Sequence, residues 1–421
     1  MSRIAIAGDF TFPHGSAASS RVRNFAEGFI ENGAQVRILS LSPQVVSEGE
    51  DPRKLRSLGP IEYRCLAEQS PGRTATRLGT KRNRAWGAKL RWFVDAYTVG
   101  FRVRRELDHL LSDGRWELVL LYGRSAARLL PLVSIARRHS VPTLLDVTEL
   151  PSMFGGVGGV LSPIYWDWQI GSRRLAASVD GVSVIARGLE SSVRIHGGRE
   201  VILVPGIEGW EDLLPAPDVG PGDEFMLLYV SALIRRDNPE MLFECVRRAR
   251  RLGAKIVLQV TGRYSGSPEA GALVAKVQSD PELSGAVRFL GELPDDRLRA
   301  MMRASDGLVL LRRNAETEVC SFPTRLVEYL QQGRPVVISD VGDISSYLEN
   351  GREAILLDPK DPDRAAGQLA GLAAMPDRGH ALGLAGRVRG AREFDRRTHT
   401  RRLLEFAGRL AASRGRGGVA L

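Results

Sequence analysis

The groups best suited to bind a ligand lie close together between residues 321 and 333, in the run SFPTRLVEYLQQG. Pro323 fixes a turn, and Thr324 takes the N-cap position of a helix that continues with Arg325. Free N–H groups at the start of a helix, aided by the helix dipole, bind phosphate. Glu328 lies one turn further in, where its carboxylate can accept hydrogen bonds from both hydroxyls of a ribose. The pattern predicts a nucleotide site.

A regular alternation of short apolar runs and charged, amphipathic segments must position these groups. This alternation is typical of βαβ units with a parallel sheet between layers of helices. Amphipathic helices are expected at Ser19–Asn32, Arg124–His139 and Arg392–Arg414. The expected strands are Arg3–Gly8, Gln35–Leu41, Leu118–Tyr122, Pro142–Asp146, Val182–Ile185, Val201–Val204, Phe225–Val230, Lys255–Thr261, Val287–Leu290, Gly307–Leu311 and Pro335–Ser339.

One segment interrupts the alternation and divides the chain. The stretch Pro205–Asp223 is rich in proline and glycine, and it predicts an interdomain linker. We therefore expect an α/β protein of two Rossmann-like domains at residues 1–205 and 224–392, joined by residues 206–223. A terminal helix at about 393–421 would pack back on the first domain. Ligands in such doubly wound sheets bind at the carboxyl ends of the strands.

At residues 321–328 the chain resembles the retaining glycosyltransferases of family 4, and the likeness continues through the second half. These enzymes have the GT-B fold, in which two Rossmann-like doubly wound parallel-sheet domains face a central cleft. The segments that carry the resemblance, in family-like order and spacing, are Tyr229–Glu240, Val287–Leu293, Ala304–Leu311, Ser321–Gly333 and Asn350–Leu357.

The resemblance implies a nucleotide-diphosphate sugar as the donor, transfer to an acceptor hydroxyl with retention, and no bound metal or other cofactor. It implies that Arg236 contacts the donor diphosphate and assists catalysis, and that the backbone at Leu290 and Gly291 reads the nucleobase. Glu328 would hold the ribose. The remaining residues that we assign to the donor site are Ser321, Pro323, Thr324, Arg325 and Gly262.

The chain departs from the family pattern at one position. Many members carry a second glutamate eight positions before the ribose-binding one, near the sugar, and Cys320 stands there. Glu316 and Glu318 are close by but out of register. Members with a similar Phe-Pro-Ser/Thr-Lys/Arg signature often lack the first glutamate, so the departure does not indicate inactivation.

The first domain offers a glycine- and serine-rich loop after its first strand. The backbone N–H groups of Gly15 and Ser16 could approach the donor phosphates, and an ordinary strand-to-helix turn is the alternative. His14, in the same loop, is not expected to be catalytic. After the fourth expected strand, Asp146 and Glu149 could orient the acceptor hydroxyl as catalytic residues, with simple capping of the turn by Asp146 as the alternative.

Positive charge is concentrated in one part of the first domain. The formal net charge is +10, and the segment Arg73–Phe93 has five arginines, two lysines, three aromatic residues and no acid. Such a segment could lie on an anionic membrane surface, as this region of the first domain often does in the family, or form a solvated loop with its tryptophans packed on the core. The glycine-rich residues 155–159 would form an acceptor-side loop.

The overall composition is that of a soluble cytoplasmic protein, with contact at the inner face of the membrane as an extension. The N-terminus lacks the profile of a signal peptide, no run is long enough to cross a membrane, and Cys65, Cys245 and Cys320 form no disulfide or metal pattern. Two rival functions remain: a non-catalytic nucleotide-sugar-binding partner, and a sugar-nucleotide 2-epimerase of similar architecture. The acceptor could be lipid-linked, a glycan or a small-molecule aglycone. No motif supports nucleic-acid binding.

Overall fold

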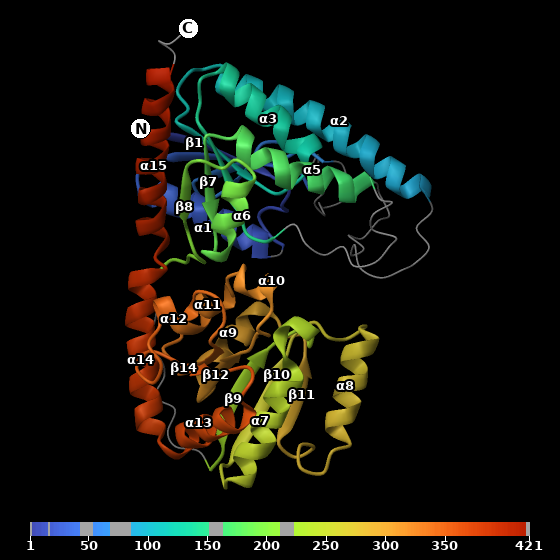
Figure 1. Cartoon of the computed structure of the whole chain (residues 1–421), viewed down its shortest axis with the longest axis vertical. Helices are drawn as coiled ribbons and strands as arrows, with labels where there is room; N and C mark the ends of the chain where they lie inside the picture. The colour runs from blue at the N-terminus through green and yellow to red at the C-terminus, as the bar shows by residue number, and fades with distance from the viewer. Residues whose placement is uncertain are drawn as a thin grey trace. The chain divides into compact units, whose positions relative to one another are not determined.

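A computed structural model describes residues 2–15, 17–42, 54–67, 86–150, 163–210 and 223–417. The chain forms two compact units (Figure 1). The first comprises Met1–Gly209 together with Arg396–Leu421, and the second comprises Trp210–Asp395. Most of the expected linker, residues 211–222, lies outside the described residues.

The first unit is built on an eight-stranded sheet with the order β3-β4-β2-β1-β5-β6-β7-β8. All neighbouring strands are parallel except β3 and β4, which form an antiparallel pair at one edge. The strands are β1 (Arg3–Gly8), β2 (Gln35–Ser40), β3 (Arg56–Leu58), β4 (Ile61–Cys65), β5 (Leu118–Tyr122), β6 (Thr143–Val147), β7 (Gly181–Val184) and β8 (Val201–Leu203).

Helices cover this sheet, and one of them comes from the far end of the chain. Arg396, at the start of the last helix, forms ion pairs with Glu27 and Glu31. Phe406 and Leu410 of the same helix join the core beneath β1. The described helices of the unit are α1 (Ala17–Glu31), α2 (Trp86–Leu111), α3 (Ala126–Arg138), α5 (Pro163–Ser178), α6 (Gly188–Ile195) and α15 (Arg396–Gly417).

The second unit contains a six-stranded parallel sheet with the order β11-β10-β9-β12-β13-β14. The chain first adds strands on one side of β9 and then crosses to its other side with β12, which creates a switch point between these two strands. The strands are β9 (Phe225–Val230), β10 (Ile256–Thr261), β11 (Val287–Gly291), β12 (Gly307–Leu310), β13 (Val336–Ser339) and β14 (Ile355–Leu357).

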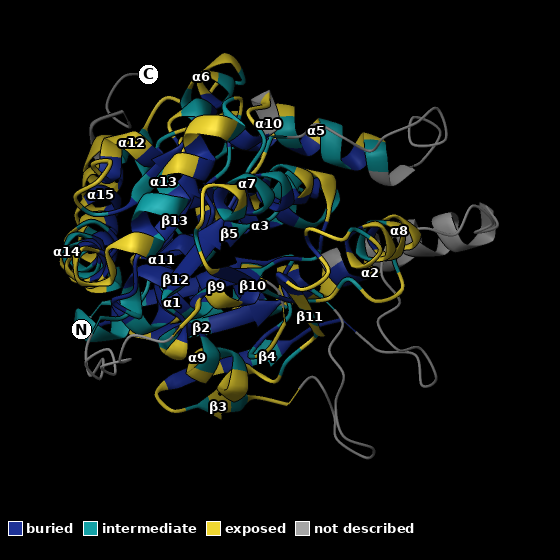
Figure 2. Cartoon of the chain, turned by 90° about the horizontal axis from the view of Figure 1, so that it is seen from below, coloured by how far each residue is buried: buried dark blue, intermediate teal, exposed yellow. Residues whose placement is uncertain are grey.

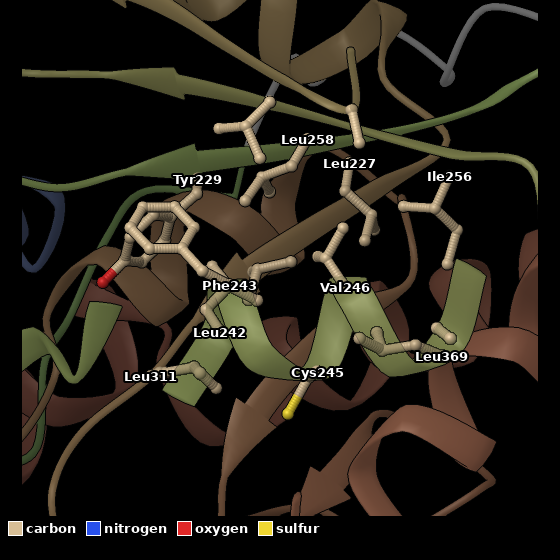
Figure 3. Packing of buried hydrophobic residues seen from close by; sticks show 14 of the residues in the cluster. Leu227, Tyr229, Leu242, Phe243, Cys245, Val246, Ile256, Leu258, Leu311 and Leu369 are labelled. Carbon is tan, nitrogen blue, oxygen red and sulfur yellow. The ribbon is translucent and has the colours of Figure 1, made fainter. Parts of the chain in front are cut away.

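The core of the second unit lies between the sheet and α7. Figure 3 shows Leu242, Phe243 and Val246 of that helix facing Tyr229 and Leu227 of the sheet. The strands β9 and β10 are mostly buried and are drawn largely in dark blue in Figure 2. The helices are α7 (Pro239–Arg251), α8 (Pro268–Gln278), α9 (Asp295–Ala304), α10 (Glu316–Val319), α11 (Arg325–Gln331), α12 (Ile344–Tyr347), α13 (Pro362–Ala374) and α14 (Pro376–Glu393), with the 3₁₀ turn η1 (Arg235–Asp237).

The expected fold class, two doubly wound parallel α/β sheets, is confirmed. Each expected strand agrees with an observed strand to within one residue at either end. The predicted start of the helix Arg392–Arg414 is wrong. The helical structure is interrupted after Glu393, at the end of α14, and resumes at Arg396 as α15. Phe394 is fully buried at this break and packs on Phe322 and Tyr347.

Candidate functional site

The carboxyl edge of the second sheet brings together the two loops at its switch point. The loop after β9 runs through η1 into α7, and the loop after β12 runs into α10. The backbone N–H of Arg313 donates to the carbonyl of Arg236 over 3.2 Å and ties the two loops together. Ligands of doubly wound sheets bind at such a point, since the loops diverge there and leave a crevice.

The loop after β9 is held by a compact set of buried hydrogen bonds. Ser231 donates from its hydroxyl to Asp237 over 2.7 Å and accepts from the N–H of Leu233 over 2.8 Å. The hydroxyl of Tyr229 donates to the carbonyl of Asp237 over 2.6 Å. Burial raises the pKa of the Asp237 carboxyl, and the nearby Glu318 raises it further. The turn is therefore rigid, which fixes the base of its arginine side chains.

Arginine side chains from both loops reach the same buried carboxylate. Arg236 Nε lies 3.1 Å from Glu318 Oε2, and Arg312 Nη1 lies 3.4 Å from the same oxygen. The Arg236 side chain is 39% exposed, whereas that of Glu318 is 9% exposed. The predicted diphosphate contact, Arg236, thus lies at the switch point with its side chain partly exposed.

The start of α11 lies in the same unit and carries the remaining polar residues of the motif. Pro323 is buried, and its carbonyl accepts from the N–H of Leu326 over 2.8 Å. Thr324 takes the position before the helix with helical dihedral angles, and its side chain makes no capping hydrogen bond. Cap chemistry alone therefore does not explain a threonine here.

Glu328 and Arg325 form a half-exposed pair one turn apart. Arg325 Nη1 donates to Glu328 Oε2 over 3.2 Å, and the two side chains are 36% and 40% exposed. Ser321, just upstream, donates to the carbonyl of Glu318 over 3.1 Å. An exposed carboxylate and guanidinium on one helical turn can together bind hydroxyl and phosphate groups.

A buried tyrosine links this helix to the sheet. The hydroxyl of Tyr329, in α11, accepts from the backbone N–H of Val230 at the end of β9 over 3.3 Å. Burial raises the pKa of Tyr329 far above its ordinary value, so the group stays neutral. The helix that carries Glu328 is therefore anchored to the strand that leads to Arg236.

The ends of β9, β10 and β11 approach closely at their glycines. A side chain at Gly262 would collide with the carbonyl of Ser231, so only glycine fits there. The N–H of Gly262 donates to the carbonyl of Gly291 over 2.9 Å. The register shifts at this point, which leaves Leu290 opposite no residue of β10, with its side chain 37% exposed. A bulge at a strand end can direct backbone groups toward a flat ligand such as a base.

The Gly15 loop of the first unit is close-packed. A side chain at Gly15 would meet the hydroxyl oxygens of Thr11 and Ser19, so the position requires glycine. Ser16 lies outside the described residues, and His14 is exposed.

The two acids at the end of β6 differ sharply. Asp146 has a fully buried side chain, and its oxygens bind Arg21 over 2.6 and 2.9 Å. Ser183 donates to one of these oxygens over 2.7 Å. Glu149 is 54% exposed and pairs with Arg124 over 2.9 Å. Asp146 therefore fastens α1 to β6 and β7 in this structure, and Glu149 is the acid of the two that faces solvent.

Several predicted features have no described side chains. Residues 73–85 and 155–159 lie outside the described residues, and residues 86–93 are described only as backbone of α2. Within the part of the chain that the structure describes, no cluster of metal-binding side chains occurs. No described helix combines the length and the apolar composition needed to cross a membrane.

Sequence reasoning missed Arg312 and Asp237 and set Glu318 aside as out of register. A usable signal exists for Arg312, which follows closely after β12, whereas Asp237 lies further along its loop, in η1 after β9. Residues in such positions converge even when they are far apart in the sequence.

Comparison with known proteins agrees with this geometry. Residues 224–374, which carry the site on the second sheet, match the family model for glycosyl transferases group 1. A D-inositol 3-phosphate glycosyltransferase of Thermomonospora curvata is 30% identical over 44% of this chain, which corresponds to 43% of that relative's own length. A GDP-mannose-dependent alpha-(1-6)-phosphatidylinositol monomannoside mannosyltransferase of Mycolicibacterium smegmatis is 25% identical over 73% of this chain and 80% of its own.

Solved structures resemble the whole chain. Sucrose-phosphate synthase from Thermosynechococcus elongatus superposes with a TM-score of 0.69 at 16% identity, covering 98% of this chain and all of that one. HepE from Anabaena in complex with UDP-glucose gives a TM-score of 0.64 at 13% identity, covering 96% and 99%. At these identities the likeness concerns the fold, which is GT-B.

Proposed function

We propose that this chain, whose residues 224–374 match the family model for glycosyl transferases group 1, transfers a sugar from a nucleotide-diphosphate sugar to an acceptor hydroxyl with retention. The observation that carries the proposal is the coincidence of the family match with the switch point of the second sheet, where Arg236 and Arg312, with side chains 39% and 19% exposed, lie beside Glu318. Positive charge at the carboxyl edge of a doubly wound sheet suits a nucleotide diphosphate.

In this proposal the donor lies along the edge of the second sheet. Glu328 accepts hydrogen bonds from the ribose hydroxyls, and Arg236 binds the diphosphate. Thr324, Arg325 and the preceding Ser321 and Pro323 line the start of α11 beside it. The nucleobase lies against the bulge at Leu290 and Gly291.

The chemistry requires no covalent intermediate on the protein. The bond between the anomeric carbon and the diphosphate oxygen breaks, while the acceptor oxygen bonds to the same face of that carbon. The acceptor proton passes to the departing diphosphate. Arg236 stabilises the charge that develops on that leaving group, which is electrostatic catalysis. From the first unit, backbone groups at Gly15 and Ser16 would contact the phosphates, and Glu149 would orient the acceptor.

The acceptor class follows from the relatives' names and remains part of the proposal. Those names include D-inositol 3-phosphate and a phosphatidylinositol monomannoside, so phosphorylated or lipid-linked polyols are the first acceptors to assay. We also propose that residues 73–93 contact an anionic membrane surface. In the described part of the first unit, Phe101 of α2 and Trp166 of α5 expose 72% and 52% of their surface. Co-sedimentation with anionic but not neutral vesicles, lost when the basic residues of 73–93 become glutamine, tests this contact.

A thermal-shift screen of nucleotides and nucleotide sugars tests the donor site, since a ligand that binds only the folded state raises its Tm. We expect one nucleoside diphosphate and its sugar to raise the Tm. Glu328→Ala should abolish that shift and leave the Tm without ligand unchanged. Losing two hydrogen bonds to a charged group corresponds to at least about tenfold weaker binding.

Glu349→Ala is the matched control, because Glu349 also pairs with an arginine three positions along, over 3.0 Å, on the surface of the same unit. It should leave the ligand-induced shift intact. An equal shift in wild type and Glu328→Ala would refute the donor assignment. Incubation of the donor alone separates transfer from epimerisation, and binding without turnover over many acceptors would favour the binding-partner alternative.

A further inference from the structure

Glu318 lies between two guanidinium groups that come from different parts of the second unit. Its Oε2 atom is 3.1 Å from Arg236 Nε and 3.4 Å from Arg312 Nη1. Arg312 Nη1 also lies 3.7 Å from Asp237 Oδ1. One carboxylate oxygen thus has two guanidinium groups around it, which is also how an arginine pair surrounds a phosphate oxygen.

The backbone places these groups across the switch point. Arg236 belongs to η1 after β9, and Arg312 follows β12, the neighbouring strand. The N–H of Arg312 donates to the hydroxyl of Ser339 at the end of β13 over 3.0 Å. Arg312 therefore begins at the switch point, which is where doubly wound sheets generally bind their ligands.

The burial of the three side chains differs in a way that suggests their roles. Glu318 is 9% exposed, Arg312 is 19% exposed and Arg236 is 39% exposed. A carboxylate this buried is tolerated only when it is paired and hydrogen-bonded. Each guanidinium has five N–H donors in a planar fork, so one edge can remain on Glu318 while another binds a second anion.

We propose that Arg312 binds the donor diphosphate together with Arg236, and that Glu318 is the positioning residue that holds both guanidinium groups toward it. The inference rests on the proposed function and deepens its diphosphate site. In this inference the diphosphate is bound by one arginine from each loop at the switch point, Arg236 and Arg312. The buried carboxylate of Glu318 is the counter-ion that both arginines share.

The test is calorimetric titration with the nucleoside diphosphate that stabilises the wild type and with the monophosphate of the same base. Arg312→Gln should raise the Kd for the diphosphate about ten- to a hundredfold, the value of a charged hydrogen bond. The Kd for the monophosphate should rise much less. The ratio of the two Kd values, which measures the preference for the diphosphate, should therefore become smaller. Arg312→Lys keeps the positive charge but not the planar guanidinium, so its Kd for the diphosphate should lie between those of the wild type and Arg312→Gln.

Arg251→Gln is the control for net charge. Arg251 is the last residue of α7, away from the carboxyl edge of the sheet. Its guanidinium donates two hydrogen bonds of 2.6 Å to the carboxylate of Glu282. This variant should leave both Kd values within about twofold. An unchanged preference for the diphosphate in Arg312→Gln, or in Arg312→Lys if the glutamine variant does not fold, would overturn the assignment of Arg312.

Glu318→Gln tests the positioning role separately, since it keeps the shape of the side chain and removes its charge. We expect weaker diphosphate binding, a smaller preference over the monophosphate and partial recovery in Glu318→Asp. Tighter diphosphate binding in Glu318→Gln would mean that the carboxylate competes with the ligand, and would overturn the positioning role. If wild type binds no nucleotide, the proposed function itself fails. If wild type binds and the variants match it, only this inference fails.

Discussion

Both sheets are doubly wound, yet their carboxyl edges use charge in opposite ways. In the first unit, Asp146 and Arg21 form an ion pair with side-chain exposures of 0% and 4%. Arg21 also donates to the carbonyls of Val204 and Pro205 over 2.9 and 2.7 Å. This guanidinium is occupied by the protein itself. Its role is to hold α1, β6 and the end of β8 together.

In the second unit the corresponding edge leaves charged groups accessible. Arg236, Arg325 and Glu328 are each between 36% and 40% exposed. Buried pairs that satisfy one another contribute rigidity, whereas half-exposed groups on a rigid base can exchange water for a ligand. The family match covers residues 224–374 of this second unit, which include the open edge.

The largest expected effect separates the two edges by stability. Asp146→Ala leaves Arg21 buried without its counter-ion, which typically costs about 3–5 kcal/mol. Chemical denaturation should show this loss for the first unit. The exposed pair of Arg37 with Glu62 supplies the control, and Glu62→Ala should cost less than about 1 kcal/mol. A loss below about 1 kcal/mol in Asp146→Ala would mean that the edge of the first unit is not locked by this pair.

Most of the sheet architecture could be predicted because buried parallel strands are apolar, short and separated by helices. The strands β3 and β4 were missed. Arg56–Leu58 is too short and polar to give a signal, whereas Ile61–Cys65 alternates apolar and polar residues, which is the pattern of a half-buried strand. The break between α14 and α15 was also missed. No glycine or proline marks it, and the burial of Phe394 against distant aromatic rings determines where the helix ends.

The site was predictable where it depends on local sequence. The proline, threonine and glutamate at positions 323, 324 and 328 identify the start of α11 without knowledge of the fold. Arg312 and Glu318 acquire their meaning only when β9 and β12 lie side by side. The sequence analysis set Glu318 aside because it does not lie eight positions before Glu328. In the structure, Glu318 matters because it contacts Arg236 across the switch point. Such long-range contacts carry no local pattern.

A smaller expected effect tests whether the cores of the two units bury a thiol to a similar degree, although the carboxyl edges of their sheets differ. Burial raises the pKa of the Cys65 thiol from 9.0 to about 11 and that of the Cys245 thiol from 9.0 to about 12. A raised pKa means that the folded state holds the proton more tightly than the unfolded state. The stabilisation is therefore complete below about pH 9 and is lost as the pH rises toward the folded pKa.

Measurements of unfolding free energy at pH 8 and pH 10 should show this loss, at about 1 kcal/mol per thiol. Other groups also titrate between pH 8 and pH 10, so the loss of unfolding free energy is compared between the wild type and the two cysteine variants. Cys65→Ala and Cys245→Ala should each reduce the fall between the two pH values by a similar amount, because both folded pKa values lie above 10. A reduction in one variant alone would show that the two cores differ after all.

The smallest expected effect concerns Glu149, the exposed acid of the first unit. Glu149→Gln removes a surface pair with Arg124 in which the glutamate is 54% exposed, so stability should change by less than about 0.5 kcal/mol. If the first unit serves the acceptor and the second the donor, the Kd for the nucleoside diphosphate should stay within about twofold, since charge at an exposed site is screened. The KM for the acceptor should rise, because a neutral amide is a weaker hydrogen-bond acceptor for a hydroxyl than a carboxylate. Calorimetry and steady-state kinetics on the same preparation provide both values. A tenfold change in nucleotide affinity with an unchanged acceptor KM would reverse the assignment, and it would place the donor within reach of an edge whose neighbouring charges are otherwise committed to the fold.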